Sequence, residues 1–144
     1  MMEVSSKIKV VFAGSPHVSA KILENLILNK DFDLKLVISQ PPKRKKRGAL
    51  TEDTEVTKIA KKNNVSVINP ERIDDDVKKI LNKTEFDILL VTAYGMILPK
   101  WLLDMPYSAA VNIHFSLLPK LRGASPIHSA ILENQDITGL SYMQ

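Results

Sequence analysis

The chain has 144 residues and a net charge of +4, and 44% of its residues are hydrophobic while 25% are charged. This length and balance predict one globular domain; they exclude a disordered chain, and no apolar run approaches the roughly 18 residues of a membrane span. The sequence has no cysteine, which excludes disulfides and thiolate chemistry, and its three scattered histidines do not predict a zinc site.

The first part of the chain predicts a cytoplasmic protein that opens with a strand, a helix and a second strand. Residues 1–9 lack the apolar core of a signal peptide. A β-branched apolar run at residues 7–13 is typical of a buried strand. Apolar residues then recur at helical spacing over residues 18–29, with Ser15 as the expected cap and a proline at the first helical position. Residues 34–39 predict the second strand, so the chain begins with a βαβ unit.

Gly14 occupies the place at which a dinucleotide-binding loop would begin. The segment Gly-Ser-Pro-His-Val lacks the repeated glycines that let a pyrophosphate approach the backbone. A nicotinamide site is therefore not expected, and Gly14 is interpreted as a residue that permits a tight strand-to-helix turn.

The loop after the second strand carries the positive charge of the chain. Pro41 and Pro42 exclude a helix or a central strand there. Five consecutive cations follow: Lys43, Arg44, Lys45, Lys46 and Arg47. Without these five, 15 of the 20 basic residues remain against 16 acidic ones, a net charge of −1. The run predicts contacts to nucleic-acid phosphates without base stacking, because no aromatic residue interleaves it; a solvated charged loop is the alternative.

The rest of the chain continues the alternation of helices and strands. We expect helices over residues 54–63, 71–81, 99–104 and 125–132, and strands over residues 65–68, 86–93, 109–114 and 138–143. The run at 86–93 is nearly continuously apolar, which is typical of a parallel strand covered on both faces. This alternation predicts an α/β fold with a mainly parallel sheet.

Asn112 and His114 are the candidates for chemistry. They lie two residues apart at the end of a predicted strand, so their side chains share one face. An amide and an imidazole together can donate hydrogen bonds to the oxyanion that forms when a carbonyl is attacked. A hydrogen-bonded core histidine is the alternative, and His17 and His128 have no comparable companion. Because no Gly-x-Ser-x-Gly segment is present, direct transfer between two bound substrates is favoured over a covalent intermediate.

Two neighbouring segments predict contacts to a small ligand. Tyr94, Gly95, Leu98 and Pro99 form a turn after a buried strand and can line an apolar pocket for a planar ring, although plain loop packing is equally compatible. Ser116, Pro119 and Gly123 end the strand of the candidate pair and begin a loop. A ligand held there would lie at the carboxyl end of a sheet strand.

Four segments give the chain a resemblance to a known family. They are Phe-Ala-Gly-Ser-Pro at residues 12–16, Gln-Pro at 40–41, Ala-Tyr-Gly-Met-Ile-Leu-Pro at 93–99, and Asn-Ile-His-Phe-Ser-Leu-Leu-Pro-Lys-Leu-Arg-Gly-Ala-Ser-Pro-Ile at 112–127. Together they resemble the amino-terminal, catalytic domain of the methionyl-tRNA formyltransferases. The last segment alone would mark only the wider group of formyltetrahydrofolate-using enzymes, which includes glycinamide ribonucleotide formyltransferase. The extended loop after the second strand, and a start without the glycine- and serine-rich phosphate loop of the purine enzyme, separate the two.

The resemblance implies a Rossmann-like three-layer domain that binds 10-formyltetrahydrofolate and passes its formyl group to the α-amino group of methionine on initiator tRNA. Asn112 and His114 match the family's catalytic pair. Its folate-contacting positions correspond to Ser116, Leu117, Leu118 and Pro119 and to Tyr94, Gly95, Ile97 and Leu98. Its tRNA-contacting loop corresponds to the run from Lys43 to Arg47, which is more cationic here than the family's Asp-Arg-Pro-x-Gly-Arg. No metal is implied, and we expect a monomer without membrane contact.

The resemblance also implies that residues 1–144 are an incomplete catalytic domain. The family's third catalytic residue, an aspartate, follows the segment that matches Tyr142-Met143-Gln144, and its tRNA-binding barrel domain follows later. We therefore expect this chain alone to be inactive in formylation. Two alternatives are formyl transfer to another amine, such as a purine precursor or a nucleotide sugar, and a non-catalytic module that binds folate or nucleic acid.

Overall fold

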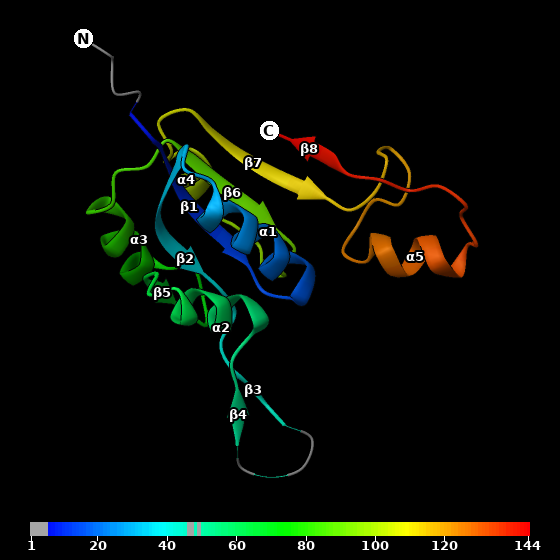
Figure 1. Ribbon diagram of the computed structural model, residues 1–144, viewed down its shortest axis with the longest axis horizontal. Coiled ribbons are helices and arrows are strands. Elements are labelled where there is room, and N and C mark those ends of the chain that lie inside the picture. The colour runs from blue at the N-terminus through cyan, green and yellow to red at the C-terminus, as the bar shows by residue number, and fades with distance from the viewer. Residues whose placement is uncertain (1–5, 46–47, 49) are drawn as a thin grey trace.

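The computed structural model describes residues 6–45, 48 and 50–144, and it shows a twisted sheet between layers of helices (Figure 1). The strands are β1 (Ile8–Gly14), β2 (Phe32–Ile38), β3 (Lys43–Arg44), β4 (Thr51–Glu52), β5 (Val67–Ile68), β6 (Ile88–Thr92), β7 (Ala109–His114) and β8 (Ser141–Met143). The helices are α1 (His17–Leu28), α2 (Glu55–Lys62), α3 (Asp75–Asn82), α4 (Lys100–Leu103) and α5 (Pro126–Leu132).

The main sheet has the strand order β5-β2-β1-β6-β7-β8. Adjacent strands of this sheet pair in parallel, except for β7 and β8, which pair antiparallel. The chain therefore builds outward from β1 to β2 and β5, and then returns to the other side of β1 for β6. The carboxyl ends of β1 and β6 lie at this change of direction, which is where open α/β sheets bind their ligands. The α/β fold and the mainly parallel sheet are confirmed.

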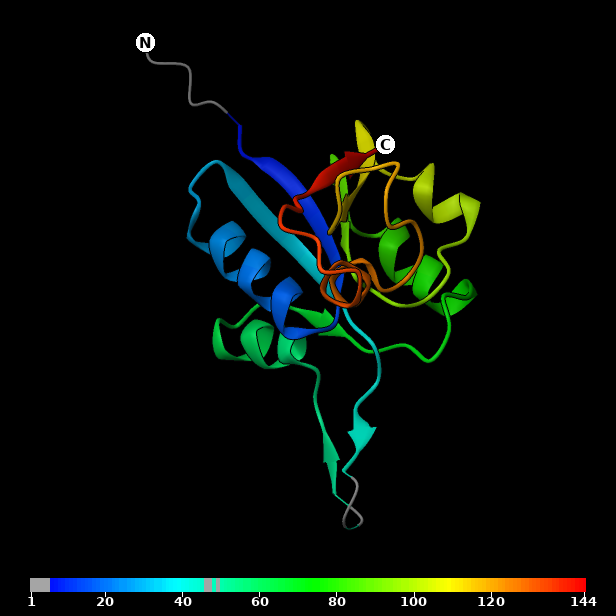
Figure 2. The same ribbon diagram turned by 90° about the vertical axis from the view of Figure 1, so that its right-hand side faces the viewer.

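Each face of the sheet is covered by its own pair of helices, as the edge-on view in Figure 2 shows. Alternate residues of β1 supply both cores: Val10 and Phe12 pack with α1 and α2, whereas Val11 and Ala13 pack with α3 and α4. All four side chains are at most 1% exposed. Burial on both faces explains why these strands read as continuous apolar runs instead of alternating patterns.

Helix α3 begins four residues later than the hydrophobic spacing predicts. The side chain of Asp74 accepts hydrogen bonds from the backbone N–H groups of Asp76 (3.1 Å) and Val77 (3.4 Å), and it is the N-cap. An aspartate satisfies helix N–H groups that otherwise lack a partner, so the helix starts at Asp75 although the apolar pattern extends further back.

The predicted cap of α1 is wrong. Pro16 occupies the N-cap position, and no side chain caps the helix. The Ser15 hydroxyl instead donates to the carbonyl oxygen of Tyr94 (3.2 Å) and accepts from the backbone N–H of Gln40 (3.2 Å). Ser15 is buried between the carboxyl ends of three strands, so these distant backbone groups take the hydroxyl away from its own helix.

The first two cations of the run lie on a short strand of an antiparallel ribbon, where the sequence predicted a loop. Strands β3 and β4 form a separate antiparallel ribbon in which Lys43 pairs with Glu52 and Arg44 with Thr51. We call residues 43–45, 48 and 50–52 the basic hairpin; its strands β3 and β4 project from the end of the sheet where β2 finishes (Figure 1). Lys46 and Arg47 lie outside the described residues. Across the part of the chain that is described, no helix is long and apolar enough to cross a membrane.

A glycine is needed at position 14 because neighbouring atoms leave no room for a side chain, and not because of an unusual backbone angle. This close packing predicts the effect of a substitution on stability. A Cβ at Gly14 would lie 2.8 Å from the carbonyl oxygen of Thr92 and 2.9 Å from Cβ of Ser19. Neither atom can move without shifting a strand or a helix, so Gly14→Ala should lower the free energy of unfolding by about 1–3 kcal/mol in urea denaturation.

Gly139→Ala is the matched control for this substitution. Its Cβ would approach the Leu117 side chain, at 2.6 Å from Cδ2 and 3.2 Å from Cγ, and Leu117 is exposed and flexible enough to turn aside. The control should cost less than about 1 kcal/mol. Equal losses in the two variants would contradict the close-packing explanation.

Candidate functional site

A cavity of about 840 Å³ lies at the carboxyl ends of β1, β6 and β7. Five parts of the chain line it: the turn after β1, the basic hairpin with its flanks, residues 91–98, Leu103 of α4, and the end of β7 with the loop into α5. These segments are far apart in sequence, and the parallel pairing of their strands brings them to one edge of the sheet.

Asn112 and His114 both line this cavity from β7. Asn112 lies opposite Val91 in the parallel register, so the pair faces the same side of the sheet as Val91 and Ala110, as predicted from the spacing. The two residues also border a second cavity of about 690 Å³, which includes Leu118 and Met143. The pair therefore lies between two spaces, each large enough for part of a ligand.

The imidazole of His114 is held by the loop that follows β7. Its Nε2 lies 2.9 Å from the carbonyl oxygen of Leu121. Because a carbonyl oxygen only accepts hydrogen bonds, Nε2 carries a proton and donates it. Nδ1 is then the ring nitrogen that is left to interact with a reactant. It accepts a proton when the ring is neutral and donates one when the ring is charged.

The loop after His114 is held by internal hydrogen bonds. The Ser116 side chain is fully buried, and its hydroxyl donates to the carbonyl oxygen of Lys120 (2.8 Å). The Ser141 hydroxyl of β8 donates to the Ser116 carbonyl oxygen (2.7 Å) and accepts from the backbone N–H of Leu118 (3.0 Å). Leu118 and Pro119 line the second cavity, whereas Ser116 and the half-exposed Leu117 line neither cavity.

Residues 94–98 contribute unequally to the larger cavity. Gly95 and Leu98 line it, and so does Met96, which was not among the folate-contacting positions that the resemblance implies. Ile97 is 93% exposed and lines neither cavity. Tyr94 borders the cavity, but its side chain is 2% exposed and belongs to the core formed with α3 and α4. Burial raises the pKa of Tyr94 to about 12, and its hydroxyl has no hydrogen-bond partner among the described residues.

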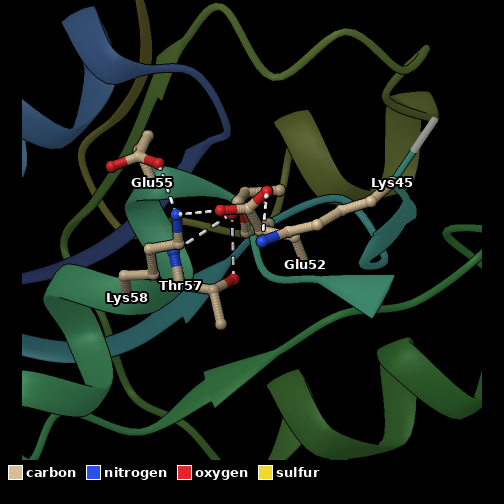
Figure 3. Close-up of polar contacts among 7 residues, drawn as sticks. Lys45, Glu52, Glu55, Thr57 and Lys58 are labelled. Carbon is tan, nitrogen blue, oxygen red and sulfur yellow. Dashed lines mark hydrogen bonds and ion pairs between the residues drawn. The ribbon is translucent and has the colours of Figure 1, made fainter. Parts of the chain in front are cut away.

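Ion pairs join the basic hairpin to α2, as Figure 3 shows. The Lys58 ammonium donates to Glu55 (2.6 Å) and to Glu52 (2.9 Å), and Lys45 lies 3.6 Å from the Glu52 carboxylate. The hydrogen bond from Lys58 and the charge of Lys45 hold the pKa of Glu52 below its usual value. The hydrogen bonds to Glu55 and Glu52 raise the pKa of Lys58. Lys45 is thus paired within the protein.

The other cations of the hairpin are placed differently. Lys43 and Arg44 line the larger cavity, and neither makes an ion pair with any residue in the ranges 6–45, 48 and 50–144. Within the same ranges, no group of three His, Asp or Glu side chains is arranged to hold a metal ion.

Two more cavity residues, Ser15 and Gln40, were not indicated as site residues by the sequence pattern. Ser15 lies two residues beyond the predicted strand at 7–13, and Gln40 directly follows the one at 34–39. The carboxyl ends of parallel strands are where ligand sites form. Their position after strands one and two was the signal that could have identified them.

Comparison with known proteins gives a consistent set of relatives. Residues 6–144 match the formyl transferase family. A methionyl-tRNA formyltransferase of Mycoplasmopsis pulmonis is 43% identical over 136 residues, which are 92% of this chain and 45% of that protein. The corresponding protein of Prochlorococcus marinus is 41% identical over 138 residues, which are 94% of this chain and 42% of that protein. The chain thus spans less than half the length of these relatives.

Solved structures share the fold at lower identity. Phosphoribosylglycinamide formyltransferase from Bacillus halodurans has a TM-score of 0.72 at 21% identity, over 93% of this chain and 70% of that chain. A formyltetrahydrofolate deformylase from Pseudomonas syringae has a TM-score of 0.69 at 20% identity, over 95% of this chain and 45% of that chain. At these identities the likeness establishes the Rossmann-like α/β fold alone.

The buried hydroxyl of Tyr94 predicts a pH dependence of stability. Its pKa of about 12 in the folded chain exceeds the unfolded value of about 10, so the stabilising contribution is complete below pH 10 and is lost as the pH rises towards 12. At pH 11 this loss amounts to about 1 kcal/mol of unfolding free energy. Tyr94→Phe should lack this loss, and at neutral pH it should be at least as stable because it removes an unpaired buried hydroxyl.

Denaturant unfolding at pH 7 and at pH 11 measures both effects. Tyr107→Phe is the control, because Tyr107 is 72% exposed and its hydroxyl is not desolvated. If the Tyr94→Phe variant loses as much stability at high pH as the parent chain, the raised pKa of Tyr94 is not the cause of the loss.

Proposed function

Because the chain belongs to the formyl transferase family, we propose that it forms the catalytic domain of an enzyme that transfers the formyl group of 10-formyltetrahydrofolate to methionyl initiator tRNA. One observation carries this proposal: the basic hairpin and the pair Asn112 and His114 line the same cavity. A polyanionic acceptor held by Lys43 and Arg44 can therefore bring its reactive end to the amide and the imidazole.

The relatives support the choice of acceptor. The curated proteins that match at about 40% identity are methionyl-tRNA formyltransferases, whereas the purine enzyme and the deformylase share only the fold. The basic hairpin gives a physical reason for the same choice. A purine precursor or a nucleotide sugar is small and has few phosphates, and it does not need a cationic arm that projects from the domain.

The larger cavity suits the folate. Val91, Met96 and Leu98 provide an apolar wall of the kind that accepts a planar pterin ring, and Gly95 brings backbone close to it. Asn112 lies beside Val91 on the neighbouring strand, and His114 lines the same cavity. We assign the formyl-bearing part of the folate to the boundary between the two cavities, with Leu118 and Pro119 along the remainder of the molecule.

The chemistry proposed for this pair is a direct transfer. The methionyl amine attacks the formyl carbon, a C–N bond forms, and the carbonyl oxygen takes negative charge in a tetrahedral intermediate. The Asn112 amide donates a hydrogen bond to that oxygen. Nδ1 of His114 takes a proton from the attacking amine and can return it to the folate nitrogen as its bond to the formyl carbon breaks. No metal has a part in these steps.

We further propose that the enzyme acts as a monomer in the cytoplasm. One chain supplies both the hairpin and the reactive pair, so no second copy is needed to complete the cavity. Charged initiator tRNA and folate are the two partners that this arrangement has to bring together.

The first test of this proposal concerns the hairpin. Lys43→Gln and Arg44→Gln should each weaken binding of initiator tRNA and reduce the slope of log affinity against log salt by about 0.7–0.9, since each removes one phosphate contact. Lys45→Gln should change the slope less, because Lys45 is paired with Glu52. Fluorescence anisotropy with labelled tRNA over a range of KCl concentrations measures the slopes.

A control substitution, Lys79→Gln, removes an exposed charge on α3 that is paired with Asp76 away from the hairpin. If the hairpin variants show the same slope as this control, the hairpin does not bind tRNA and formyl transfer to a small amine becomes the better function.

The second test concerns His114. In an active enzyme that contains this chain, His114→Ala should lower the turnover of formylation by a factor of about 10² or more and leave the affinity for folate nearly unchanged. Single-turnover formylation of methionyl-tRNA and calorimetry with 5-formyltetrahydrofolate measure the two quantities. The exposed His128 on α5 serves as a control whose replacement by alanine should change neither. Normal turnover in His114→Ala would remove this residue from the mechanism.

A further inference from the structure

We propose that Gln40 is a positioning residue, which shapes the larger cavity by tying the base of the basic hairpin to residues 93–98. This inference rests on the proposed function for its consequence, but the contact itself is independent of it. Gln40 follows β2 and directly precedes the two prolines that lead into the hairpin.

The side chain of Gln40 closes a small ring of hydrogen bonds. Its Nε2 donates to the carbonyl oxygen of Tyr94 (2.9 Å), and the Ser15 hydroxyl donates to the same oxygen (3.2 Å). The backbone N–H of Gln40 donates to that hydroxyl (3.2 Å). Three segments, from the ends of β1, β2 and β6, are therefore joined at one carbonyl group. Ser15 is 8% exposed, so water competes little for these bonds.

The backbone held by this ring has an unfavourable conformation. Ala93 has a φ of 44° and Gly95 a φ of 80°, both in the left-handed region, and an alanine rarely adopts such an angle. A Cβ on Gly95 would lie 2.5 Å from Nε2 of Gln40, so the Gln40 amide packs directly against this glycine. A strained turn persists when its surroundings hold it, and Gln40 supplies both a hydrogen bond and a packing surface.

The other side of Gln40 is anchored beneath the hairpin. The Asn69 amide donates to the Gln40 carbonyl oxygen (3.0 Å) and to the Thr57 hydroxyl (2.8 Å) of α2. Just after β4, where the hairpin returns to the domain, the hydroxyl of Thr54 lies 2.6 Å from the hydroxyl of Ser39. Both ends of the hairpin are thereby fixed to the sheet. The side chain of Gln40 is the part that reaches from this anchor to the cavity wall.

It follows that Gln40 couples the two binding regions. The hairpin that would hold the phosphates and the turn that would pack against the folate share this side chain. Gln40 does not have to touch either substrate for this role, and its loss should move the wall at Gly95 and Met96 without unfolding the domain.

The test uses two substitutions of similar length. Gln40→Met keeps the volume and removes the donor, and Gln40→Glu places a carboxylate against the Tyr94 carbonyl oxygen. In calorimetry with 5-formyltetrahydrofolate, we expect the Kd to rise about threefold to tenfold for methionine and about tenfold or more for glutamate, with melting temperatures within a few degrees of the parent chain. The control is Gln135→Ala, whose amide donates only to Glu133 in an exposed turn.

Hydrogen exchange gives a second readout that does not depend on folate. Amides of residues 93–99 should exchange about fivefold faster in Gln40→Met than in the parent chain, while those of β1 and of α1 keep their rates. A double-mutant comparison adds to this. Gly95→Ala should lower the melting temperature less in the Gln40→Met background than in the parent chain, because a flexible thioether there replaces the amide under the new Cβ.

The outcomes separate the two proposals. If the parent chain does not bind 5-formyltetrahydrofolate, the proposed function fails, and the exchange rates alone decide the role of Gln40. Unchanged exchange at residues 93–99 in both variants would overturn the positioning role. Faster exchange throughout the sheet, with a large fall in melting temperature, would also overturn it, because Gln40 would then be a general stability residue.

Discussion

The parallel pairing of β6 with β1 and with β7 is the constraint on which the rest of the structure depends. It aligns Gly14 with Thr92 and Val91 with Asn112, so the turn after β1, the loop after β6 and the candidate pair Asn112 and His114 on β7 meet at one edge. The close fit is evident at Gly14, where even a methyl group would meet the carbonyl oxygen of Thr92. The walls of the larger cavity at residues 15–16, 91–98 and 112–115 follow from this register.

The basic hairpin shows how a highly charged segment is held near such an edge. Exposed ion pairs are individually weak, so Glu52 alone would not fix its position. The hairpin is also anchored at both ends by polar contacts of Gln40 and Thr54 with the sheet and α2. Glu52 takes Lys45 as a partner within the protein and leaves Lys43 and Arg44 facing the cavity. Lys45 is therefore not equivalent to Lys43 and Arg44, although the three are adjacent in the sequence.

Much of the fold and part of the candidate site could be predicted because they depend on local pattern. Buried parallel strands and amphipathic helices have characteristic periods, and Asn112 and His114 share a face because a strand alternates. Prediction failed where distant groups compete with local ones. Ser15 has the sequence context of a helix cap, but the Tyr94 carbonyl oxygen and the Gln40 N–H group take its hydroxyl. In residues 94–98, Ile97 is exposed while Met96 lines the cavity, because the direction of each side chain depends on positive φ angles at Ala93 and Gly95.

The amino-acid sequence by itself determined the α/β class, the order of the main-sheet strands along the chain, the shared face of Asn112 and His114 and the concentration of charge in one segment. These follow from hydrophobic period, turn residues and composition, which act over a few neighbouring residues. Only the tertiary structure decided that Lys43 and Arg44 line the cavity and that Lys45 is paired with Glu52. It also decided that Gln40 holds the turn at Tyr94, across 54 positions of sequence. Contacts at such separations depend on strand order and register, and no local pattern specifies them.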